Sequence, residues 1–399
     1  MAEDRKAVLV LKDGTYYEGT GFGASAKVEG EVVFNTVTLG YAECMTDPSY
    51  KGQILTFSYP LIGNIGVPSP NERDEYGISK FFESDYEPIA PGAPAAAYED
   101  YSGPHLIKTR GIVVHEACKV PSHVTSSMTL DQWLKREGVP GIEGIDTRAL
   151  IKKLRDDGAM LGILQVFDEG DDINIEKLQA EASKVADPDT QNLVGEVSIK
   201  EPLHYEHKDG LFKVVVIDLG TKFNILRSLL SRQVSVLRVP YNFSAKEILE
   251  YKPNGILITN GPGNPKHEGL QSTIEATRQL VDEGIPLMGI CSGNQIFALA
   301  MGADTFKLKF GHRSANQPSI DLETNRCYVT FQNHGYAVIA DSLQQTDLKL
   351  WYVNLNDQTV EGVKHTKAKA YSVQFHPEHL PGPIDAKHLF DQFIEMMKS

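Results

Sequence analysis

The sequence lacks the features that mark several large classes of protein. Its 399 residues include four cysteines, Cys44, Cys118, Cys291 and Cys327, and their wide, irregular spacing gives no C-x-x-C pair. Neither a disulfide framework nor a zinc knuckle is therefore indicated. No long apolar run occurs, and the first residues are acidic rather than basic and apolar, so the sequence predicts no membrane segment and no export signal. We expect a cytoplasmic protein without a metal site.

Positive charge is also scarce. Lysines and arginines number 39 against 53 aspartates and glutamates, which gives a formal net charge of −14. Such acidity argues against nucleic-acid binding and leaves no polybasic patch for a membrane surface. A G-x-x-x-x-G-K-[ST] phosphate loop is missing as well, so we expect no nucleotide cofactor in this chain. The length is enough for about two or three domains with sizeable cores.

The hydrophobic pattern changes along the chain and predicts an α/β protein. Residues 1–160 mix short strands with turns and predict a β-rich α/β N-terminal domain. Residues 161–211 form a polar, acidic connection, and in residues 212–399 apolar strands alternate with helical segments. This alternation is typical of a doubly wound, mostly parallel sheet with its site at the C-terminal ends of the strands. The clearest expected strands are Lys6–Leu11, Val32–Asn35, Ile54–Ser58, Val214–Ile217, Val234–Val239 and Ile256–Ile258, and the clearest helices are Thr147–Asp156, Asn224–Ser231, Leu270–Glu283 and Asp385–Lys398.

The most informative feature of the second half is Cys291. An apolar run leads into it, the helix-like stretch Gln295–Ala300 follows it, and a glycine stands two residues away on each side. This G-x-C-x-G pattern predicts a strand, a tight turn that holds the cysteine in a strained conformation, and a helix. The positive end of that helix would stabilise a negative sulfur and an oxyanion. Cysteine is also a common small core residue, so the pattern alone supports a nucleophile and a core residue about equally.

A second informative segment, Ala370–Glu378, alternates like a strand and ends in His-Pro-Glu. Because side chains two apart on an extended chain share a face, we expect Glu378 to orient the His376 imidazole, which then takes the proton of the cysteine. A plain strand-ending turn is the alternative, because Pro377 itself favours extended geometry at the preceding residue. A metal site made by His376, Glu378 and His379 is disfavoured, because Pro377 prevents the helical spacing that zinc hydrolases use.

A glycine-rich turn adds a third candidate segment. The buried strand that ends at Thr259 leads into Asn260-Gly261-Pro262-Gly263. Glycines let a backbone approach a ligand, so an N–H group of this turn could join that of Ser292 in a two-donor oxyanion hole. On its own, a Gly-Pro-Gly run is common loop punctuation.

Together, the three segments resemble the class I (triad) glutamine amidotransferases, in which a nucleophilic cysteine precedes a His-x-Glu pair near the C-terminus. The first half of the chain narrows this resemblance to the small subunit of carbamoyl phosphate synthetase. The motifs that carry it are Gly30–Thr36, Gly40-Tyr41, Thr46–Tyr50, Gln53-Ile54, Tyr59–Asn64, Gly144–Arg148 and Gln332–Tyr336. The similarity spans nearly the whole chain, and other amidotransferases lack such an N-terminal domain.

The resemblance implies a role for each site residue. Cys291 is the implied nucleophile, His376 the general base and acid, and Glu378 the residue that orients the imidazole. The implied contacts of L-glutamine are Ser49, Gly261, Gly263, Ser292, Gln295, Asn333, Gly335 and Tyr336. A neutral amide with a charged amino-acid head needs several such hydrogen bonds. Ser49 would bring one of them from the N-terminal domain, at the domain seam.

The implied reaction requires a partner. The thiolate attacks the glutamine carboxamide, ammonia leaves, and water hydrolyses the γ-glutamyl thioester. Ammonia must stay unprotonated and out of bulk water, so it needs a dry path to a second active site. The resemblance places that site on the large subunit of carbamoyl phosphate synthetase, together with ATP, bicarbonate and magnesium, and implies no cofactor in this chain. The carbamoyl phosphate would serve pyrimidine synthesis, arginine synthesis or both.

The elbow around the cysteine departs from the pattern of many relatives, which read GICLGHQ. Here Ser292 and Asn294 replace the leucine and the histidine. We expect Ser292 to act mainly through its backbone N–H and Asn294 to keep polar contacts. Some urea-cycle relatives with a Gly-Asn pair have serine at the cysteine position and have lost glutamine hydrolysis. Because this chain keeps Cys291, His376 and Glu378, we predict an active glutaminase with altered kinetics.

Two other functions fit parts of the pattern. One is a stand-alone cysteine hydrolase of γ-glutamyl bonds, which would need no N-terminal interaction domain. The other is an inactive scaffold of a synthetase, which would have no need of Cys291, His376 and Glu378. A partner-dependent glutaminase accounts for both halves of the chain.

Overall fold

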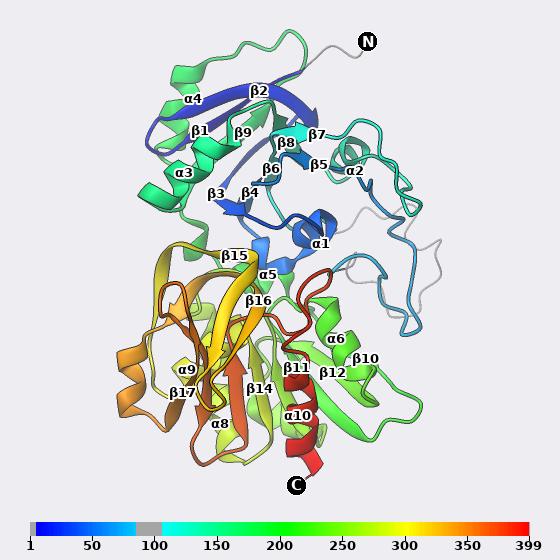
Figure 1. The fold of residues 1–399 in the computed structure, drawn as a ribbon, viewed down its shortest axis with the longest axis vertical. Coiled ribbons are helices and arrows are strands. Elements are labelled where there is room, and N and C mark those ends of the chain that lie inside the picture. Colours follow the sequence, from blue (N-terminus) through cyan, green and yellow to red (C-terminus); the bar gives the residue numbers. More distant parts are fainter. Residues whose placement is uncertain (1–4, 85–105, 399) are drawn as a thin grey trace.

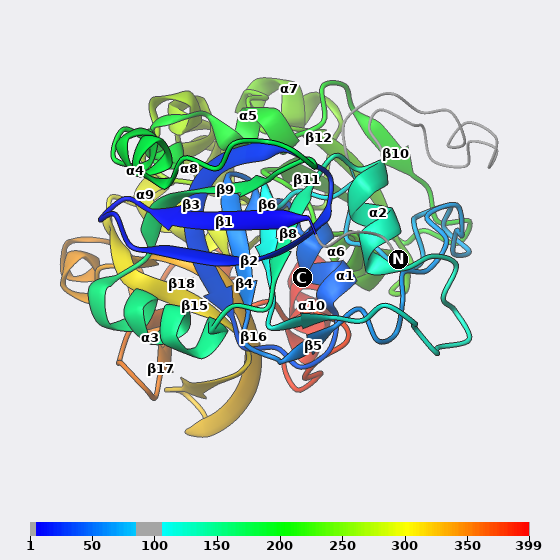
Figure 2. The same ribbon diagram turned by 90° about the horizontal axis from the view of Figure 1, so that it is seen from above.

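Seven described strands of the first half of the chain close into a barrel, in the order β1-β2-β8-β6-β4-β3-β9. The computed structural model describes residues 5–84 and 106–398, and the barrel occupies the upper part of Figure 1 and faces the viewer in Figure 2. The barrel strands are β1 (Lys6–Leu11), β2 (Tyr16–Gly23), β3 (Lys27–Asn35), β4 (Gln53–Phe57), β6 (Gly111–Val113), β8 (Pro140–Glu143) and β9 (Met160–Val166). Alternating side chains such as Leu9, Val32 and Leu164 share one core, as expected for strands with one face inward.

Short helices and turns cover the barrel. They are α1 (Tyr41–Thr46), the 3₁₀ turn Pro48–Tyr50, α2 (Leu130–Arg136) and α3 (Thr147–Asp157), and a short pair of strands, β5 (Leu61–Ile62) and β7 (Glu116–Ala117), lies beside them. The predicted helix 147–156 is confirmed. Asp146 caps it by accepting a hydrogen bond from the Ala149 N–H at 2.9 Å, and Gly158 follows its end at φ 105°.

The boundary expected at residue 160 falls at the start of a barrel strand. β9 pairs with β1 and β3, so the barrel continues to Val166. The connection beyond it holds α4 (Ile175–Ala182), the 3₁₀ turn Pro188–Thr190 and α5 (Leu193–Val197). β10 (Leu203–Tyr205) pairs with a strand of the second sheet, which therefore begins before residue 212. Both differences arise because strand pairing, not composition, decides which sheet a segment joins.

The second half forms a sheet of ten described strands in the order β10-β12-β11-β13-β14-β19-β18-β17-β15-β16. Its strands beyond β10 are β11 (Phe212–Asp218), β12 (Val234–Pro240), β13 (Gly255–Ile258), β14 (Leu287–Ile290), β15 (Thr305–Asp321), β16 (Arg326–Val338), β17 (Leu348–Asn354), β18 (Val360–His365) and β19 (Ala370–Val373). The central run from β12 to β19 is parallel, and the flanking pairs are antiparallel.

Helices cover both faces of this sheet, which confirms the predicted doubly wound fold. α6 (Phe223–Leu230) and α10 (His388–Lys398) pack on one face, and α7 (Ala245–Glu250), α8 (Gln271–Asp282) and α9 (Ser292–Ala300) pack on the other. Successive residues of β11 alternate between the two cores: Val214 and Val216 face α6 and α10, and Val215 and Ile217 face α7 to α9.

The long hairpin of β15 and β16 was not foreseen from the sequence. It rises from the second sheet toward the barrel in Figure 1. There the Thr36 N–H donates to the Arg313 carbonyl at 3.1 Å, and the Ala159 N–H donates to the Lys309 carbonyl at 2.9 Å. Its register shifts between Lys307 and His312, which is the kind of irregularity that re-aims side chains beside a site. The hairpin thus joins the two halves of the molecule.

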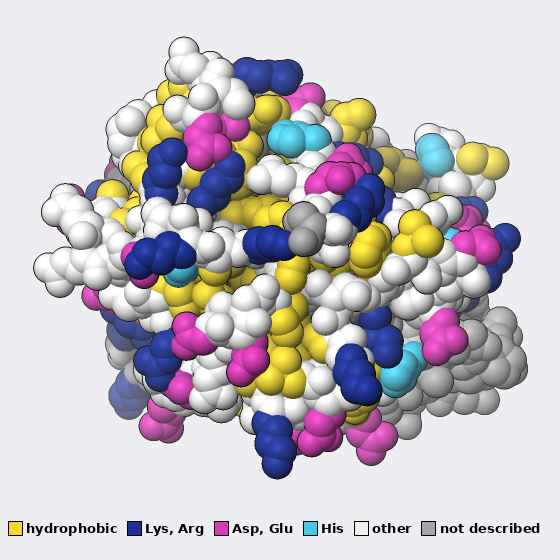
Figure 3. All heavy atoms as spheres, turned by 90° about the horizontal axis from the view of Figure 1, so that it is seen from below, with side chains coloured by type: hydrophobic (Ala, Val, Ile, Leu, Met, Phe, Trp, Pro, Cys, Tyr) yellow, Lys and Arg dark blue, Asp and Glu magenta, His cyan; other side chains and the backbone are white. Residues whose placement is uncertain are grey.

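The face opposite the barrel carries mixed charge. Lys, Arg, Asp and Glu side chains are interspersed there around a central group of hydrophobic side chains (Figure 3). The excess of acid in the sequence is therefore not gathered into a patch of one sign on this face. Within residues 5–84 and 106–398, every helix is too short or too polar to span a lipid bilayer.

Candidate active site

A strained turn presents Cys291 between β14 and α9. Its backbone has φ 56° and ψ −105°, a left-handed value that a non-glycine residue rarely adopts. A Cβ on Gly289 would lie 2.6 Å from the Gly293 carbonyl oxygen, and a Cβ on Gly293 would lie 2.2 Å from the Ile258 carbonyl oxygen. The two glycines are therefore needed so that strand, turn and helix can pack this tightly, as the sequence pattern predicted.

His376 and Glu378 lie beside this turn. β14 pairs with β19, and the Cys291 N–H donates to the Val373 carbonyl at 2.8 Å. The Nδ1 atom of His376 lies 2.7 Å from Oε1 of Glu378. Nε2 of His376 has no hydrogen-bond partner in the described chain, and Cys291 is close enough to help raise the pKa of this imidazole. All three side chains are at most 2% exposed, so the group is shielded from water.

The predicted contact between His376 and Glu378 is present, but the predicted reason for it, a shared face of one strand, is wrong. β19 ends at Val373, so His376 and Glu378 do not stand on one face of a strand. The chain leaves the sheet, and a turn around Pro377 brings the carboxylate back to the imidazole. The His376 N–H is held by the Phe331 carbonyl at 2.9 Å, which fixes the segment against β16.

Buried charges set the protonation of this group. Burial alone would lower the pKa of His376, but the Glu378 carboxylate raises it to about 10. Burial alone would raise the pKa of Glu378, but Lys222 and His376 lower it to about 2. The Lys222 ammonium lies 3.2 Å from Glu378 Oε1 and 3.0 Å from Nδ1 of His379. Glu378 is therefore ionised at neutral pH and holds the imidazole in one orientation.

Sequence reasoning missed Lys222. It follows β11 in a strand-to-helix turn, where a lysine is ordinarily a solvated charge, yet its side chain is fully buried. Burial lowers its pKa, and the Glu378, Glu83 and Asp47 carboxylates more than compensate, so the pKa is raised and the ammonium stays charged. The only sequence signal was a lysine in the short turn between an apolar strand and a helix. Because Glu83 and Asp47 come from the N-terminal half, this burial depends on how the two halves pack.

The eight predicted glutamine contacts line one cavity, with about 30 Å³ of free space. Its lining comprises Glu31, Ser49, Gln53, Asp189, Gly261, Pro262, Gly263, Ser292, Gln295, Lys307, Arg313, Asn333, His334, Gly335 and Tyr336. The Cys291 thiol points to the carbonyl oxygen of Asn333, 3.6 Å from Sγ. The candidate nucleophile and the candidate binding residues are thus brought together.

The cavity lies on the seam between the two halves. Ser49 Oγ accepts a hydrogen bond from Asn260 Nδ2 at 2.9 Å, and Asn333 Nδ2 donates to Asp47 Oδ2 at 3.0 Å. Asp47 also accepts from the Ser49 N–H at 2.9 Å. A buried carboxylate of the N-terminal half therefore positions candidate binding residues of both halves. Sequence reasoning placed Ser49 here but gave Asp47 no role.

The connecting segment closes one side of the cavity. The Tyr336 hydroxyl donates to Asp189 Oδ2 at 2.7 Å, and Lys307 donates to the same oxygen at 2.6 Å. Lys307 also pairs with Glu31 of the barrel at 2.8 Å. Asp189 was missed because it is one of many acidic residues in the connecting segment. Nothing in the sequence shows which of them lies against the cavity.

Gly261, Gly263 and Ser292 have structural roles in addition to the expected glutamine contacts. A Cβ on Gly261 would lie 2.2 Å from the Leu219 carbonyl oxygen, so this glycine allows chain packing as well as ligand approach. Gly263 has φ 81°, which favours glycine. The Ser292 hydroxyl donates to the Gly261 carbonyl at 2.5 Å, which ties the glycine-rich turn to the start of α9. The expectation that Ser292 acts mainly through its backbone omitted this bond.

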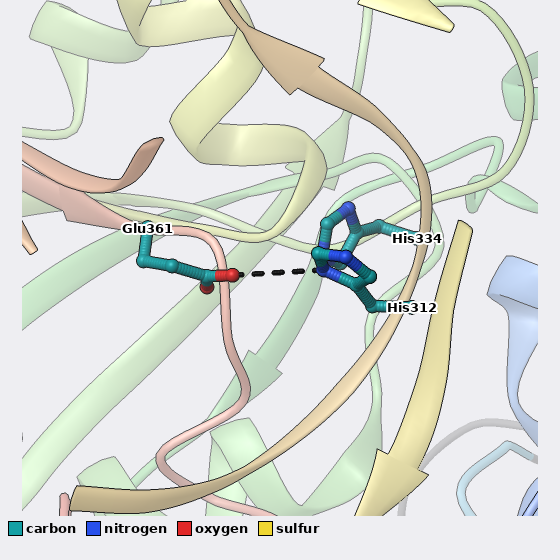
Figure 4. Close-up of side chains that lie close together, drawn as sticks. All are labelled: His312, His334 and Glu361. Atoms are coloured by element: carbon teal, nitrogen blue, oxygen red, sulfur yellow. Dashed lines mark ion pairs between the residues drawn. The ribbon is translucent and has the colours of Figure 1, made fainter. Parts of the chain in front are cut away.

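A buried group of His312, His334 and Glu361 has atoms within 4.8 Å of one another (Figure 4). His312 lies 2.8 Å from Asp357 Oδ2 through Nε2, and its Nδ1 lies 2.9 Å from Gln332 Oε1 and 3.6 Å from Glu361 Oε1. Burial alone would lower the pKa of His312, but hydrogen bonds to the two carboxylates raise it to about 9. Both ring nitrogens of His312 already face oxygen acceptors, so this group fits an internal polar network better than a metal site.

Comparisons with known proteins agree with this geometry. Residues 9–164 match the family described as Carbamoyl-phosphate synthase small chain, CPSase domain, and residues 215–396 match Glutamine amidotransferase class-I. The carbamoyl phosphate synthase small chain of Methanopyrus kandleri is 44% identical over 394 residues, 98% of this chain and 99% of the relative. That of Listeria monocytogenes is 46% identical over 392 residues, 98% and 97% of the two chains. The arginine-specific small chain of Chaetomium globosum is 44% identical over 390 residues, 98% and 78% of the two chains. This chain therefore belongs to the family of carbamoyl phosphate synthase small chains, and its second half is a class I glutamine amidotransferase domain.

Proposed function

We propose that this chain is the glutamine-hydrolysing small subunit of a carbamoyl phosphate synthase. The observation that carries the proposal is the convergence of a cysteine on a strained turn, a carboxylate-oriented histidine and a seam cavity lined by polar groups. The small-chain names of the relatives support it over nearly the whole chain. A scaffold would not require a carboxylate buried against Lys222 and His376, as Glu378 is. A stand-alone hydrolase would not require Ser49 and Asp47 from a separate barrel.

The residues divide the chemistry of amide hydrolysis. The Cys291 thiolate attacks the carboxamide carbon of glutamine, and the backbone N–H at the start of α9 holds the negative oxygen that forms. His376 donates its Nε2 proton to the departing nitrogen, which leaves as ammonia, and a γ-glutamyl thioester remains. His376 then takes a proton from water, which attacks the thioester and releases glutamate. Glu378 keeps Nδ1 protonated and the ring in place.

The ammonia is the useful product in this proposal. It passes, without meeting bulk water, to a large subunit that binds ATP, bicarbonate and magnesium and makes carbamoyl phosphate. This chain itself then needs no cofactor. The names of the relatives include both general and arginine-specific small chains, so either supply route for carbamoyl phosphate is compatible with the proposal.

The test compares Cys291→Ser with wild type, each alone and with the cognate large subunit. Glutamate release and carbamoyl phosphate formation are measured from glutamine and, separately, from added ammonia. We expect Cys291→Ser to lose glutamine hydrolysis by roughly 10³-fold or more, because the nucleophile is gone. Ammonia-dependent synthesis should stay within about twofold of wild type, because the large subunit is unchanged. Cys327→Ser is the matched control, since Cys327 is exposed, and it should behave as wild type.

Three outcomes would contradict the proposal. Full hydrolysis by wild type without the large subunit, with no further rise on adding it, would favour a stand-alone hydrolase. No hydrolysis by the wild-type complex, with ammonia-dependent synthesis intact, would favour a scaffold. Equal hydrolysis by wild type and Cys291→Ser would show that another residue is the nucleophile.

A further inference from the structure

A buried glutamine touches the sulfur of the proposed nucleophile. Gln374 is fully buried, and its Nε2 atom lies 3.7 Å from Cys291 Sγ. Its backbone follows Val373, whose carbonyl accepts the Cys291 N–H, and its own N–H donates to the Glu361 carbonyl at 2.8 Å. The side chain is therefore held next to the elbow by the pairing of β14 with β19. Gln374 has no part in the mechanism proposed above.

The orientation of the Gln374 amide follows from that of Gln295, which is fixed by the Tyr336 carbonyl because a carbonyl can only accept. Gln295 Nε2 donates to the Tyr336 carbonyl at 2.8 Å, and the same nitrogen donates its other hydrogen to Gln374 Oε1 at 3.2 Å. Asn294 Nδ2 donates to Gln374 Oε1 as well, at 3.1 Å, and Ser372 Oγ donates to Asn294 Oδ1 at 2.9 Å. If the Gln374 amide were flipped, its N–H₂ group would face the N–H₂ groups of Asn294 and Gln295, and no acceptor would be present among them. The N–H₂ group must therefore face the sulfur.

The two protonation states of the sulfur use different neighbours. As a thiol, Cys291 can donate its hydrogen to the Asn333 carbonyl, which lies 3.6 Å away. As a thiolate, it has no hydrogen to donate, and the partial negative charge of that carbonyl is unfavourable. The Gln374 N–H₂ group is then a donor already in place, and hydrogen bonds to an ionised acceptor are about twice as strong as neutral ones.

We propose that Gln374 is a further catalytic residue, which donates an N–H to the Cys291 thiolate and so stabilises the attacking form of the sulfur. When the Sγ proton passes to His376 Nε2, the sulfur keeps the electron pair and accepts the Gln374 hydrogen bond. Asn294 is a positioning residue in this scheme, because it acts only through the Gln374 oxygen. The inference rests on the proposed role of Cys291 and deepens it.

The test measures thiolate formation directly, without glutamine turnover. The rate of Cys291 alkylation by iodoacetamide is followed by mass spectrometry as a function of pH, in wild type and in Gln374→Met, with the chain bound to its large subunit. Methionine fills a similar volume but cannot donate to the sulfur. We expect the midpoint of the profile to move up by about one pH unit, the size of one charge-assisted hydrogen bond. In the same variant, kcat for glutamine hydrolysis should fall about tenfold with little change in KM.

Ser372→Ala is the matched control. It removes one polar group from the same buried network but leaves every Gln374 bond in place, so its alkylation midpoint should equal that of wild type. If Gln374→Met does not fold, as judged by circular dichroism, Gln374→Glu keeps the oxygen that Asn294 and Gln295 require and puts a carboxylate against the sulfur. Its midpoint should rise at least as far.

Unchanged midpoints in folded Gln374 variants would overturn the inference, and so would an equal shift in Ser372→Ala, which would indicate a structural effect. These results do not depend on glutaminase activity. A wild-type complex that fails to hydrolyse glutamine would overturn the proposed function, whereas a hydrolysing complex with unchanged alkylation midpoints would overturn only the role of Gln374.

Discussion

Single residues in this protein obtain their properties from neighbours that are distant in sequence. Lys222 is buried against Glu378 of the second half, and its pKa is also raised by the negative charges of Glu83 and Asp47 of the first half. Glu83 in turn holds the start of α6, because its Oε1 accepts from Asn224 Nδ2 at 2.6 Å. An uncompensated charge at this depth would be strongly destabilising. The ionised state of Glu378, and with it the orientation of His376, therefore depends on correct packing of the barrel.

At the same scale, we predict a pH-dependent contribution of His312 to stability. The groups that face it are Asp357, Glu361, Gln332 and the ring of His334. Its pKa is about 9 when folded and about 6.5 when unfolded, so its stabilisation is complete below pH 6.5 and is lost as the pH rises through 9. The difference in the free energy of unfolding between wild type and His312→Gln should shrink by on the order of 2 to 3 kcal/mol between pH 6 and 10.

Urea unfolding at several pH values gives this difference directly. The buried His376, whose pKa is also raised, is common to both proteins, so its contribution cancels. A difference that stays constant with pH would mean that His312 is neutral in the folded protein.

The sequence allowed us to predict which residues lie together at the candidate site, but not which buried charges surround them. Cys291, His376 and Glu378 stand in short local patterns, and the eight cavity residues followed from motifs matched along the chain. Lys222, Asp47 and Asp189 were missed because a charged residue looks the same in sequence whether it is solvated or buried. Only the packing of distant segments separates the two cases.

At the scale of elements, the elbow between β14 and α9 depends on two positions without side chains. We predict that Gly293→Ala moves α9 away from β13, because the new Cβ would meet the Ile258 carbonyl oxygen at 2.2 Å. Backbone cannot give way as a flexible side chain does. Glutamine hydrolysis should fall by roughly 10²-fold, since a misplacement of about 1 Å at a reacting group has this effect. Thermal unfolding and steady-state kinetics measure the two consequences.

Gly284→Ala is a control for this prediction. Gly284 has φ 75°, and a Cβ there would meet nothing within 4 Å. The substitution should lower stability by about 1 to 2 kcal/mol through backbone strain, with full activity. If both alanine variants lost stability but kept activity, the spacing at the elbow would not matter for the chemistry.

Elements with a local signature were predicted well, and elements that need distant partners were not. Asp146 and Gly158 bounded α3 correctly, and the apolar runs gave β11, β12 and β13. The hairpin of β15 and β16 contains many polar residues and shifts its register, so alternation does not reveal it. The strand expected to run to Glu378 stops at Val373. After one more bond to β18, from the Gln374 N–H, the chain bends and the His376 N–H donates to the Phe331 carbonyl of β16 instead.

At the scale of the whole molecule, the cavity is narrow. Its free space of about 30 Å³ suits a water molecule rather than an amino acid. Asp189 in the connecting segment forms part of its wall and binds Tyr336 and Lys307. We predict that glutamine entry requires this contact to open, so a weaker contact should strengthen apparent binding.

The measurement is calorimetric binding of glutamine to Cys291→Ser, which removes turnover. Asp189→Asn in this background should lower the apparent Kd about threefold or more. The matched control is Asp187→Asn. Asp187 lies 3.9 Å from Lys307 and caps the 3₁₀ turn by accepting from the Asp189 N–H at 2.9 Å, a bond that asparagine can keep. Weaker binding in the Asp189 variant would indicate that the contact belongs to the bound state instead.

The doubly wound domain was predictable from its alternation of strands and helices, but the closed barrel was not. Its strand order interleaves β1 to β4 with β6, β8 and β9, and no local pattern encodes such pairing. The absence of a cofactor, the cytoplasmic location and the individual residue roles stay predictions. Packing of the two halves, which places Ser49 against Asn260, could be expected only from the resemblance of the whole chain.

The position of β19 between β14 and β18 has a consequence for biosynthesis. β14 ends one residue before Cys291, but its neighbour β19 in the sheet is encoded some eighty positions later, and His376 comes after that. A nascent polypeptide that has emerged only as far as β18 has an unfilled slot in the middle of its sheet. During translation, Cys291 and His376 can therefore come together only after β19 and the segment that follows it have emerged from the ribosome.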